Sequence, residues 1–172
     1  IIWAPDRYLG DYIQRRTGAD MLLWNACCIV HAEFDAEKIK ALKAANPDAE
    51  LLVHPEAQPE VIALADVTGS TSQLLQASKT RPAKKFIVAT ESGIFYKMQQ
   101  ACPGKTFIVA PTKAQSELYQ CEGNCPWMKM NNLQNLRDAL KNNSGEIRLE
   151  PGIIEKALLP LSRMLEFRKK HS

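Results

Sequence analysis

The sequence predicts an α/β fold with short parallel sheets flanked by helices. Short apolar runs alternate with longer amphipathic stretches along the whole chain. Strands that alternate with helices in this way favour right-handed β-α-β units, in which neighbouring strands run parallel. The segments Val30-His31-Ala32-Glu33 and Val53-His54-Pro55-Glu56 share a His-x-Glu pattern, which is a faint sign of an internal repeat.

Local signals mark the ends of several expected elements. A first helix stops at Thr17-Gly18, a second is capped by Asp35 and ends before Asn46-Pro47, and a third has Pro59 in its first turn. The expected strands are residues 1–3, 21–24, 50–53, 66–68, 86–89, 106–109 and 147–149. The expected helices are residues 9–16, 35–45, 59–65, a helix after Gly69-Ser70-Thr71, 92–100, 132–141 and 153–169, with a polar loop over 111–124.

Composition excludes some functional classes. The chain has 172 residues, is 45% hydrophobic and carries a formal net charge of +3, which suits one sizeable core or two small ones. Basic and acidic residues are interleaved, so we expect no nucleic-acid partner. We also expect no membrane association, because no apolar run reaches spanning length and the first residues do not resemble a leader. The chain starts within the apolar segment Ile1-Ile2-Trp3, so we expect it to be part of a longer protein.

Two distant cysteines have unusual settings. Cys28 opens Cys28-Ile29-Val30-His31 soon after an expected strand, and Cys125 opens Cys125-Pro126-Trp127-Met128 before an expected helix. Thiolates presented at the ends of elements can meet at one metal centre, as they do in iron–sulfur proteins. The competing interpretation is that both are buried cysteines that act as small hydrophobic residues. The odd count of five cysteines argues against a disulfide framework and favours a reducing compartment.

Polar residues follow the expected strands, where ligands bind in open α/β sheets. These residues are His31, His54, Glu56, Ser70 and Thr71. His54 before Pro55 could simply end a strand, and Ser70 and Thr71 could simply cap a helix. The functional alternative for Ser70 and Thr71 is an anion site, because two hydroxyls beside helix N-terminal amides suit a phosphate or a carboxylate.

The other cysteines carry weaker signals. Cys121 and Cys125 are spaced somewhat like a zinc knuckle, but no second pair matches them. We expect Cys102, beside Pro103-Gly104 at a helix end, to be structural.

Seven short motifs occur in order along the chain. They are Pro5-Asp6-Arg7-Tyr8-Leu9-Gly10, Cys28-Ile29-Val30-His31, His54-Pro55-Glu56, Gly69-Ser70-Thr71-Ser72, Val88-Ala89-Thr90-Glu91, Cys125-Pro126-Trp127-Met128-Lys129-Met130-Asn131 and Pro160-Leu161-Ser162-Arg163-Met164-Leu165. Together they resemble the quinolinate synthase family over essentially the whole chain. The resemblance implies three-layer α/β/α domains as pseudo-symmetric repeats. On that basis we expect residues 1–28 to end one domain, 29–125 to form a second domain, and 126–172 to form a C-terminal helical segment that packs back on the rest.

The resemblance also implies an activity and a cofactor. The family condenses iminoaspartate with dihydroxyacetone phosphate to give quinolinate in NAD biosynthesis, using a 4Fe–4S cluster with one open iron. Cys28 and Cys125 correspond to two of its three cysteine ligands, and the third is missing from this chain together with an N-terminal domain. L-aspartate oxidase is implied as the supplier of one substrate, and the expected location is the cytoplasm, or the plastid in a plant.

Roles for the polar residues follow from the same resemblance. His54 and Glu56 correspond to catalytic and substrate-binding residues, Ser70 and Thr71 to substrate-binding residues, and His31 to a residue that supports the metal site. We expect the chain alone to be inactive. The alternative function is a non-catalytic α/β module that binds zinc or another protein.

Overall fold

The computed structural model describes residues 1–113 and 123–171, and it divides the chain into two units, Ile1–Lys129 and Met130–Ser172. The first unit contains a four-stranded sheet with the strand order β4-β3-β5-β6. The strands are β3 (Ala49–Val53), β4 (Val67–Thr68), β5 (Lys85–Ala89) and β6 (Thr106–Val109), and all the pairings are parallel. The predicted parallel α/β sheet is therefore confirmed.

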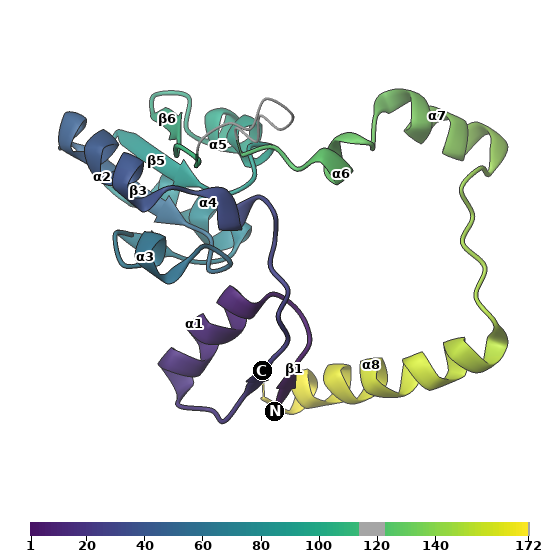
Figure 1. Ribbon diagram of the computed structural model, residues 1–172. Helices are drawn as coiled ribbons and strands as arrows, with labels where there is room; N and C mark the ends of the chain where they lie inside the picture. The colour runs from purple at the N-terminus through teal and green to yellow at the C-terminus, as the bar shows by residue number, and fades with distance from the viewer. Residues whose placement is uncertain (114–122, 172) are drawn as a thin grey trace. The chain divides into compact units, whose positions relative to one another are not determined.

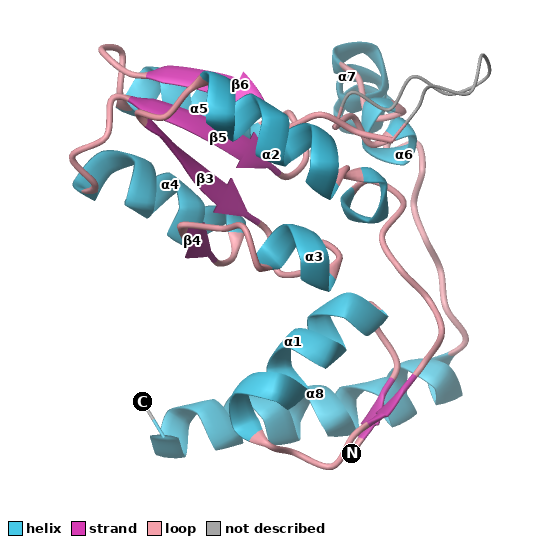
Figure 2. Ribbon diagram, turned by 60° about the vertical axis from the view of Figure 1, so that its left-hand side comes forward, coloured by secondary structure: helices cyan, strands magenta, loops and turns pink. Residues whose placement is uncertain are grey.

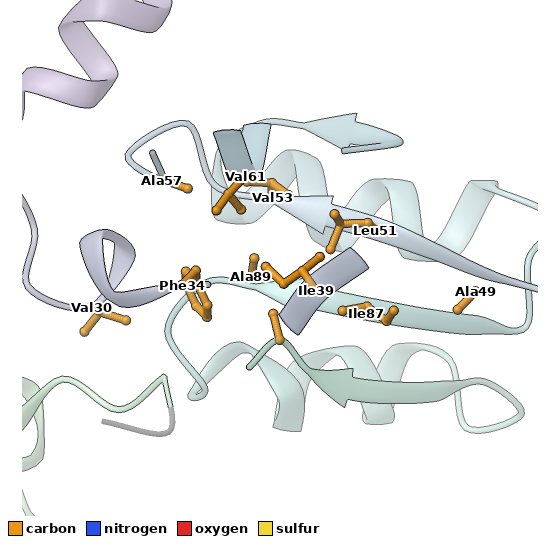
Figure 3. Packing of buried hydrophobic residues seen from close by; sticks show 11 residues of the cluster. Val30, Phe34, Ile39, Ala49, Leu51, Val53, Ala57, Val61, Ile87 and Ala89 are labelled. Carbon is orange, nitrogen blue, oxygen red and sulfur yellow. The ribbon is translucent and has the colours of Figure 1, made fainter. Parts of the chain in front are cut away.

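Helices cover both faces of this sheet, which gives three layers (Figure 2). Helices α2 (Ala36–Ala45) and α3 (Pro59–Ile62) contribute to one buried cluster, and helices α4 (Thr71–Thr80) and α5 (Ile94–Ala101) contribute to the other. Successive side chains of a strand point to opposite faces, so β3 places Leu51 and Val53 in the first cluster and Leu52 in the second. Figure 3 shows the first cluster, in which Ile39 of α2 packs with Ile87 of β5.

A smaller β-α-β element precedes this sheet. Strands β1 (Ile2–Trp3) and β2 (Leu22–Leu23) pair in parallel, and helix α1 (Arg7–Thr17) connects them (Figure 1). The helix ends at Gly18, which has a φ of 69° and so adopts the left-handed conformation that glycine favours. Gly10 of α1 is buried, and a Cβ atom there would come within 2.6 Å of the Trp3 side chain. Glycine therefore allows the helix to pack closely against its two strands.

The second unit contains α7 (Leu133–Asn142) and α8 (Pro151–His171). The expected strand at 147–149 was wrong, because residues 146–150 have no regular structure. Ile147 and Leu149 alternate with charged residues as in a strand, but the described part of this unit offers only helices, and a strand needs a partner for its backbone groups. Of the helices that the structure describes, none combines the length and apolar character needed to cross a membrane.

Two short helices lie outside the expected helix ranges, although the sequence predicts that a helix follows Cys125. They are η1 (His31–Glu33), a single 3₁₀ turn, and α6 (Pro126–Lys129), which follows Cys125 directly. Both lie beside the predicted metal ligands, so each cysteine is followed by a tight turn rather than by an extended loop.

Candidate active site

The carboxyl ends of β3, β4 and β5 open onto one cavity of about 500 Å³. The segment after β3 supplies His54 and Glu56, and the start of α4, which follows β4, supplies Thr71. Thr90 follows β5 directly, and His31 of η1 completes the polar wall. The cavity therefore lies where parallel α/β sheets bind their ligands, as the sequence predicted.

Cys28, His31 and Glu56 form a compact group of possible metal-binding residues. One ligand atom of each lies within 4.8 Å of the ligand atoms of the other two. Burial raises the pKa of the Cys28 thiol, but hydrogen bonds from His31 outweigh burial, so this pKa lies below the usual range of a thiol. A lowered thiol pKa favours the thiolate, which is the form that binds iron.

His31 is the buried centre of this group. Its Nε2 atom lies 3.0 Å from the Thr90 hydroxyl, and its Nδ1 atom lies 3.0 Å from Glu56 Oε2 as an ion pair that is not aligned as a hydrogen bond. Burial lowers the pKa of His31, but its interactions with Cys28 and Glu56 outweigh burial and raise this pKa to about 9. His31 is therefore an imidazolium at neutral pH, and it lies between the Cys28 thiol and the Glu56 carboxylate.

His54 stacks on His31 but differs from it in charge. The two rings are 4.4 Å apart between centroids and inclined by 18°. Burial lowers the pKa of His54, and the positive charge of His31 lowers it further. Its Nδ1 atom accepts a 3.3 Å hydrogen bond from the Glu56 N–H, so the proton of the neutral ring lies on Nε2. The site thus pairs a charged imidazole with a neutral one.

Glu56 carries the negative charge that balances His31. The close contact with the charged His31 ring lowers the pKa of Glu56, and this effect exceeds the opposite effect of burial. The carboxylate lies 3.8 Å from His54 Nδ1, and its side chain is 25% exposed. Glu56 is therefore ionised and also borders the cavity.

Ser70 and Thr71 have different positions at the start of α4. The Ser70 hydroxyl accepts a bond from the Gln73 N–H at 3.4 Å, and the Gln73 side chain accepts a bond from the Ser70 N–H at 2.8 Å. This reciprocal pair is a capping box. Thr71 and Ser72 line the cavity, whereas Ser70 is not among its lining residues. The capping interpretation of Ser70 is therefore confirmed, and its substrate-binding role stays a prediction.

The segment after β5 brings two further charged residues to the cavity. Glu91 and Lys97 both line it. Glu91 Oε1 is buried, lies 3.4 Å from Lys129 Nζ, and has no hydrogen-bond partner among the described residues. Glu91 Oε2 accepts a 2.6 Å hydrogen bond from the Gly93 N–H. Glu91 therefore links the end of β5 to α6, the helix that follows Cys125.

The remaining cysteines have distinct environments. Cys125 is half-buried and packs against the same hydrophobic cluster as Cys28. Cys27 is exposed, and Cys102 is buried with its Sγ 3.5 Å from the Ser78 carbonyl oxygen, which fits the predicted structural role. Cys121, whose spacing from Cys125 somewhat resembles a zinc knuckle, lies outside the described residues.

Sequence reasoning missed two residues at or near this site. Lys97 lines the cavity because it follows the cavity-lining Ile94 by three residues on α5, so helical spacing could have identified it. Asp6 was noted only as part of a motif, yet its carboxylate bonds to the Cys28 backbone. Nothing in the local sequence indicates that bond, because it joins two loops.

The fold and site together define an α/β enzyme class, in which a thiol, two imidazoles and a carboxylate gather at the carboxyl ends of a parallel sheet. The family model described as quinolinate synthetase A protein matches residues 1–166. The chain belongs to this family, whose members are iron–sulfur enzymes of NAD biosynthesis.

Proposed function

We propose that this chain carries the part of a quinolinate synthase site that condenses iminoaspartate with dihydroxyacetone phosphate. The observation that carries the proposal is the group of His31, His54 and Glu56 beside the Cys28 thiol, at the edge of a cavity large enough for small substrates. L-aspartate oxidase is the enzyme class that we propose as the supplier of iminoaspartate.

The residues present fit two of the three thiolate positions of a 4Fe–4S cluster. Cys28 has a lowered pKa, and Cys125 is half-buried against the same hydrophobic cluster. Iron–sulfur clusters are held by cysteine thiolates. When bound, the cluster supplies a Lewis-acidic iron that can polarise a hydroxyl or a carbonyl oxygen.

The protein side chains supply the proton transfers that the condensation needs. Loss of phosphate, carbon–carbon bond formation and loss of water each move a proton, and neutral imidazole is the usual group for this at pH 7. We assign proton transfer to His54, whose neutral ring carries its proton on Nε2. We assign to Glu56 the orientation of an amine or imine group of the substrate, because its carboxylate is ionised and borders the cavity.

The start of α4 suits the anionic groups of the substrates. Thr71 and Ser72 present hydroxyls at a helix N-terminus, and Lys97 adds a positive charge on the same cavity wall. We propose that these residues bind carboxylate or phosphate groups, with Ser70 contributing through the helix cap.

Alanine at positions 70 and 71 is expected to separate capping from binding. Ser70→Ala loses the capping box, so we expect the free energy of unfolding to fall by about 1 kcal/mol. Thr71→Ala is expected to leave the melting temperature nearly unchanged but to raise the KM for the substrate by roughly tenfold, because a bond to a charged group is lost. Thermal melting of the chain measures stability, and steady-state kinetics on the reconstituted enzyme measure KM. Equal changes of melting temperature and KM in both variants would show that Ser70 and Thr71 do not have separate capping and binding roles.

Anaerobic reconstitution with iron and sulfide tests the proposed function. The family centre needs three cysteine ligands, and the matching motifs here provide Cys28 and Cys125. We therefore expect the 172-residue chain alone to bind the cluster weakly and to make no quinolinate. Addition of a domain with the third cysteine is expected to give a brown, active protein. Stoichiometric zinc with no cluster in that mixture would contradict the proposal.

The zinc alternative rests on the same group of Cys28, His31 and Glu56. These side chains are common zinc ligands, but zinc requires a neutral imidazole. The group supplies three ligand residues in the described part of the chain, whereas structural zinc sites almost always use four. The motifs around Cys28 and Cys125, together with the family match, therefore lead us to favour the iron–sulfur function.

A further inference from the structure

The Asp6 carboxylate accepts hydrogen bonds from two backbone amides at once. Its Oδ1 atom accepts from the Leu9 N–H at 2.8 Å, and its Oδ2 atom accepts from the Cys28 N–H at 2.6 Å. The first bond is an ordinary cap of helix α1. The second bond adds nothing to the helix, and it joins the helix start to the residue that carries the thiol.

Asp6 is itself held firmly by its neighbours. The Trp3 indole N–H donates to the Asp6 carbonyl oxygen at 2.7 Å. The Arg7 backbone N–H donates to the Ala26 carbonyl oxygen at 2.8 Å, and the Arg7 guanidinium donates to the Asn25 side chain at 2.6 Å. The start of α1 and the loop before Cys28 are therefore bonded at several points.

Cys28 lies in a segment with little regular structure of its own. Strand β2 ends at Leu23, and η1 begins only at His31. The Cys28 carbonyl oxygen accepts from the Ala32 N–H at 3.0 Å, so the residue is held on its C-terminal side by the η1 turn. The charge-assisted bond from Asp6 holds it on its N-terminal side, and such bonds are stronger than neutral ones.

We propose that Asp6 is a positioning residue that fixes the Cys28 backbone and thereby holds the Cys28 thiol against His31. This inference rests on the proposed function only in treating Cys28 as a cluster ligand. Asp6 acts through the Cys28 amide and does not touch the reacting atoms. The residues around a metal ligand commonly tune its affinity for the metal in this way.

Asp6→Ser and Asp6→Asn separate this role from helix capping. Serine caps a helix about as well as aspartate, but its single hydroxyl cannot serve both amides. Asparagine keeps one acceptor oxygen and replaces the other with an NH₂ donor, so it too can serve only one amide. The matched control is Asp11→Ser, because Asp11 pairs with Arg15 on the same helix at 2.9 Å.

Amide exchange and the His31 ring signals, measured by NMR on the ¹⁵N-labelled chain, test the inference without any cluster. We expect the Cys28 N–H of Asp6→Ser to exchange roughly tenfold faster than in the parent, with the amides of α1 nearly unchanged. We also expect the ¹⁵N signals of the His31 ring to move at constant pH. Asp11→Ser should match the parent in both measurements. Unchanged Cys28 exchange and unchanged His31 signals in both Asp6 variants would overturn the inference.

Iron release completes the test on protein reconstituted with the domain that supplies the third cysteine. We expect a chelator to remove iron about tenfold faster from both Asp6 variants than from the parent. If the Asp6 variants released iron at the parental rate while Cys28→Ser lowered the iron content, Asp6 would be only a helix cap. If Cys28→Ser instead kept its full iron content, the ligand assignment of the proposed function would fail. The NMR signals would then still decide whether Asp6 fixes Cys28.

Discussion

Replacing Cys28 or Cys125 with serine is expected to abolish cluster binding and quinolinate formation. A serine hydroxyl is not deprotonated at neutral pH and does not replace a thiolate at iron. Mutation of a residue that only supports a metal ligand typically lowers metal affinity or activity by about 10- to 100-fold. We therefore expect loss of a ligand itself to lower activity by more than about 100-fold. Iron and sulfide content, the visible absorption of the reconstituted protein and quinolinate formation measure the effect.

Two other cysteines provide matched controls for this result. Cys27 is exposed and adjacent to Cys28, and Cys102 is buried beside Ser78. Cys27→Ser and Cys102→Ser are expected to keep the parental iron content and activity. Equal losses in all four variants would mean that the thiols act through folding, and the ligand assignment would then be wrong.

Hydrophobic patterning accounts for the part of the fold that was predicted. The central strands β3 and β5 of the large sheet are short apolar runs whose side chains are buried on both faces, and such runs are recognisable in the sequence. The pattern failed at Ile147 and Leu149, where alternation with charges looks like a strand but no neighbouring strand is described. Strand formation depends on a partner, which a local pattern cannot provide.

Most of the residues that line the cavity could be predicted from the rule that ligands bind at the carboxyl ends of parallel strands. His54 and Glu56 follow β3, and Thr71 follows β4, and all three line one cavity. The stacking of His54 on His31 could not be predicted, because it depends on the path of the loop after β2. The charge difference between those two rings also depends on their three-dimensional neighbours.

The hydrogen bond between Asp6 and Cys28 also could not be predicted, because it joins segments that are distant in the sequence. In the sequence Asp6 stands out only as part of the Pro5–Gly10 motif and Cys28 only as a possible ligand, and each signal is local. Their connection depends on where the chain returns after β2 pairs with β1. The two acceptor oxygens of Asp6 bind the start of a helix and a distant loop together, so its position as a helix cap does not describe its whole role.

Glu56→Gln is expected to lower kcat by about 100-fold while the fold is retained, because the charge that orients the substrate is lost. Glutamine keeps the shape of the side chain but removes the negative charge that pairs with His31 Nδ1 at 3.0 Å. The Glu56 backbone N–H still donates to His54, so the neutral ring keeps its tautomer. Steady-state kinetics on the reconstituted enzyme, together with thermal melting of the chain, separate catalysis from stability.

Glu60→Gln is the matched control for this prediction, because Glu60 is an exposed carboxylate on α3 that does not line the cavity. We expect its kcat and KM to equal those of the parent. Glu56→Asp keeps the charge on a shorter side chain, so we expect it to recover part of the lost activity. If Glu56→Asp and Glu56→Gln were equally inactive, the exact position of the carboxylate, and not its charge alone, would determine activity. If Glu56→Gln instead kept parental kinetics, the carboxylate would have no role in turnover, and the imidazole pair would have to orient the substrate alone.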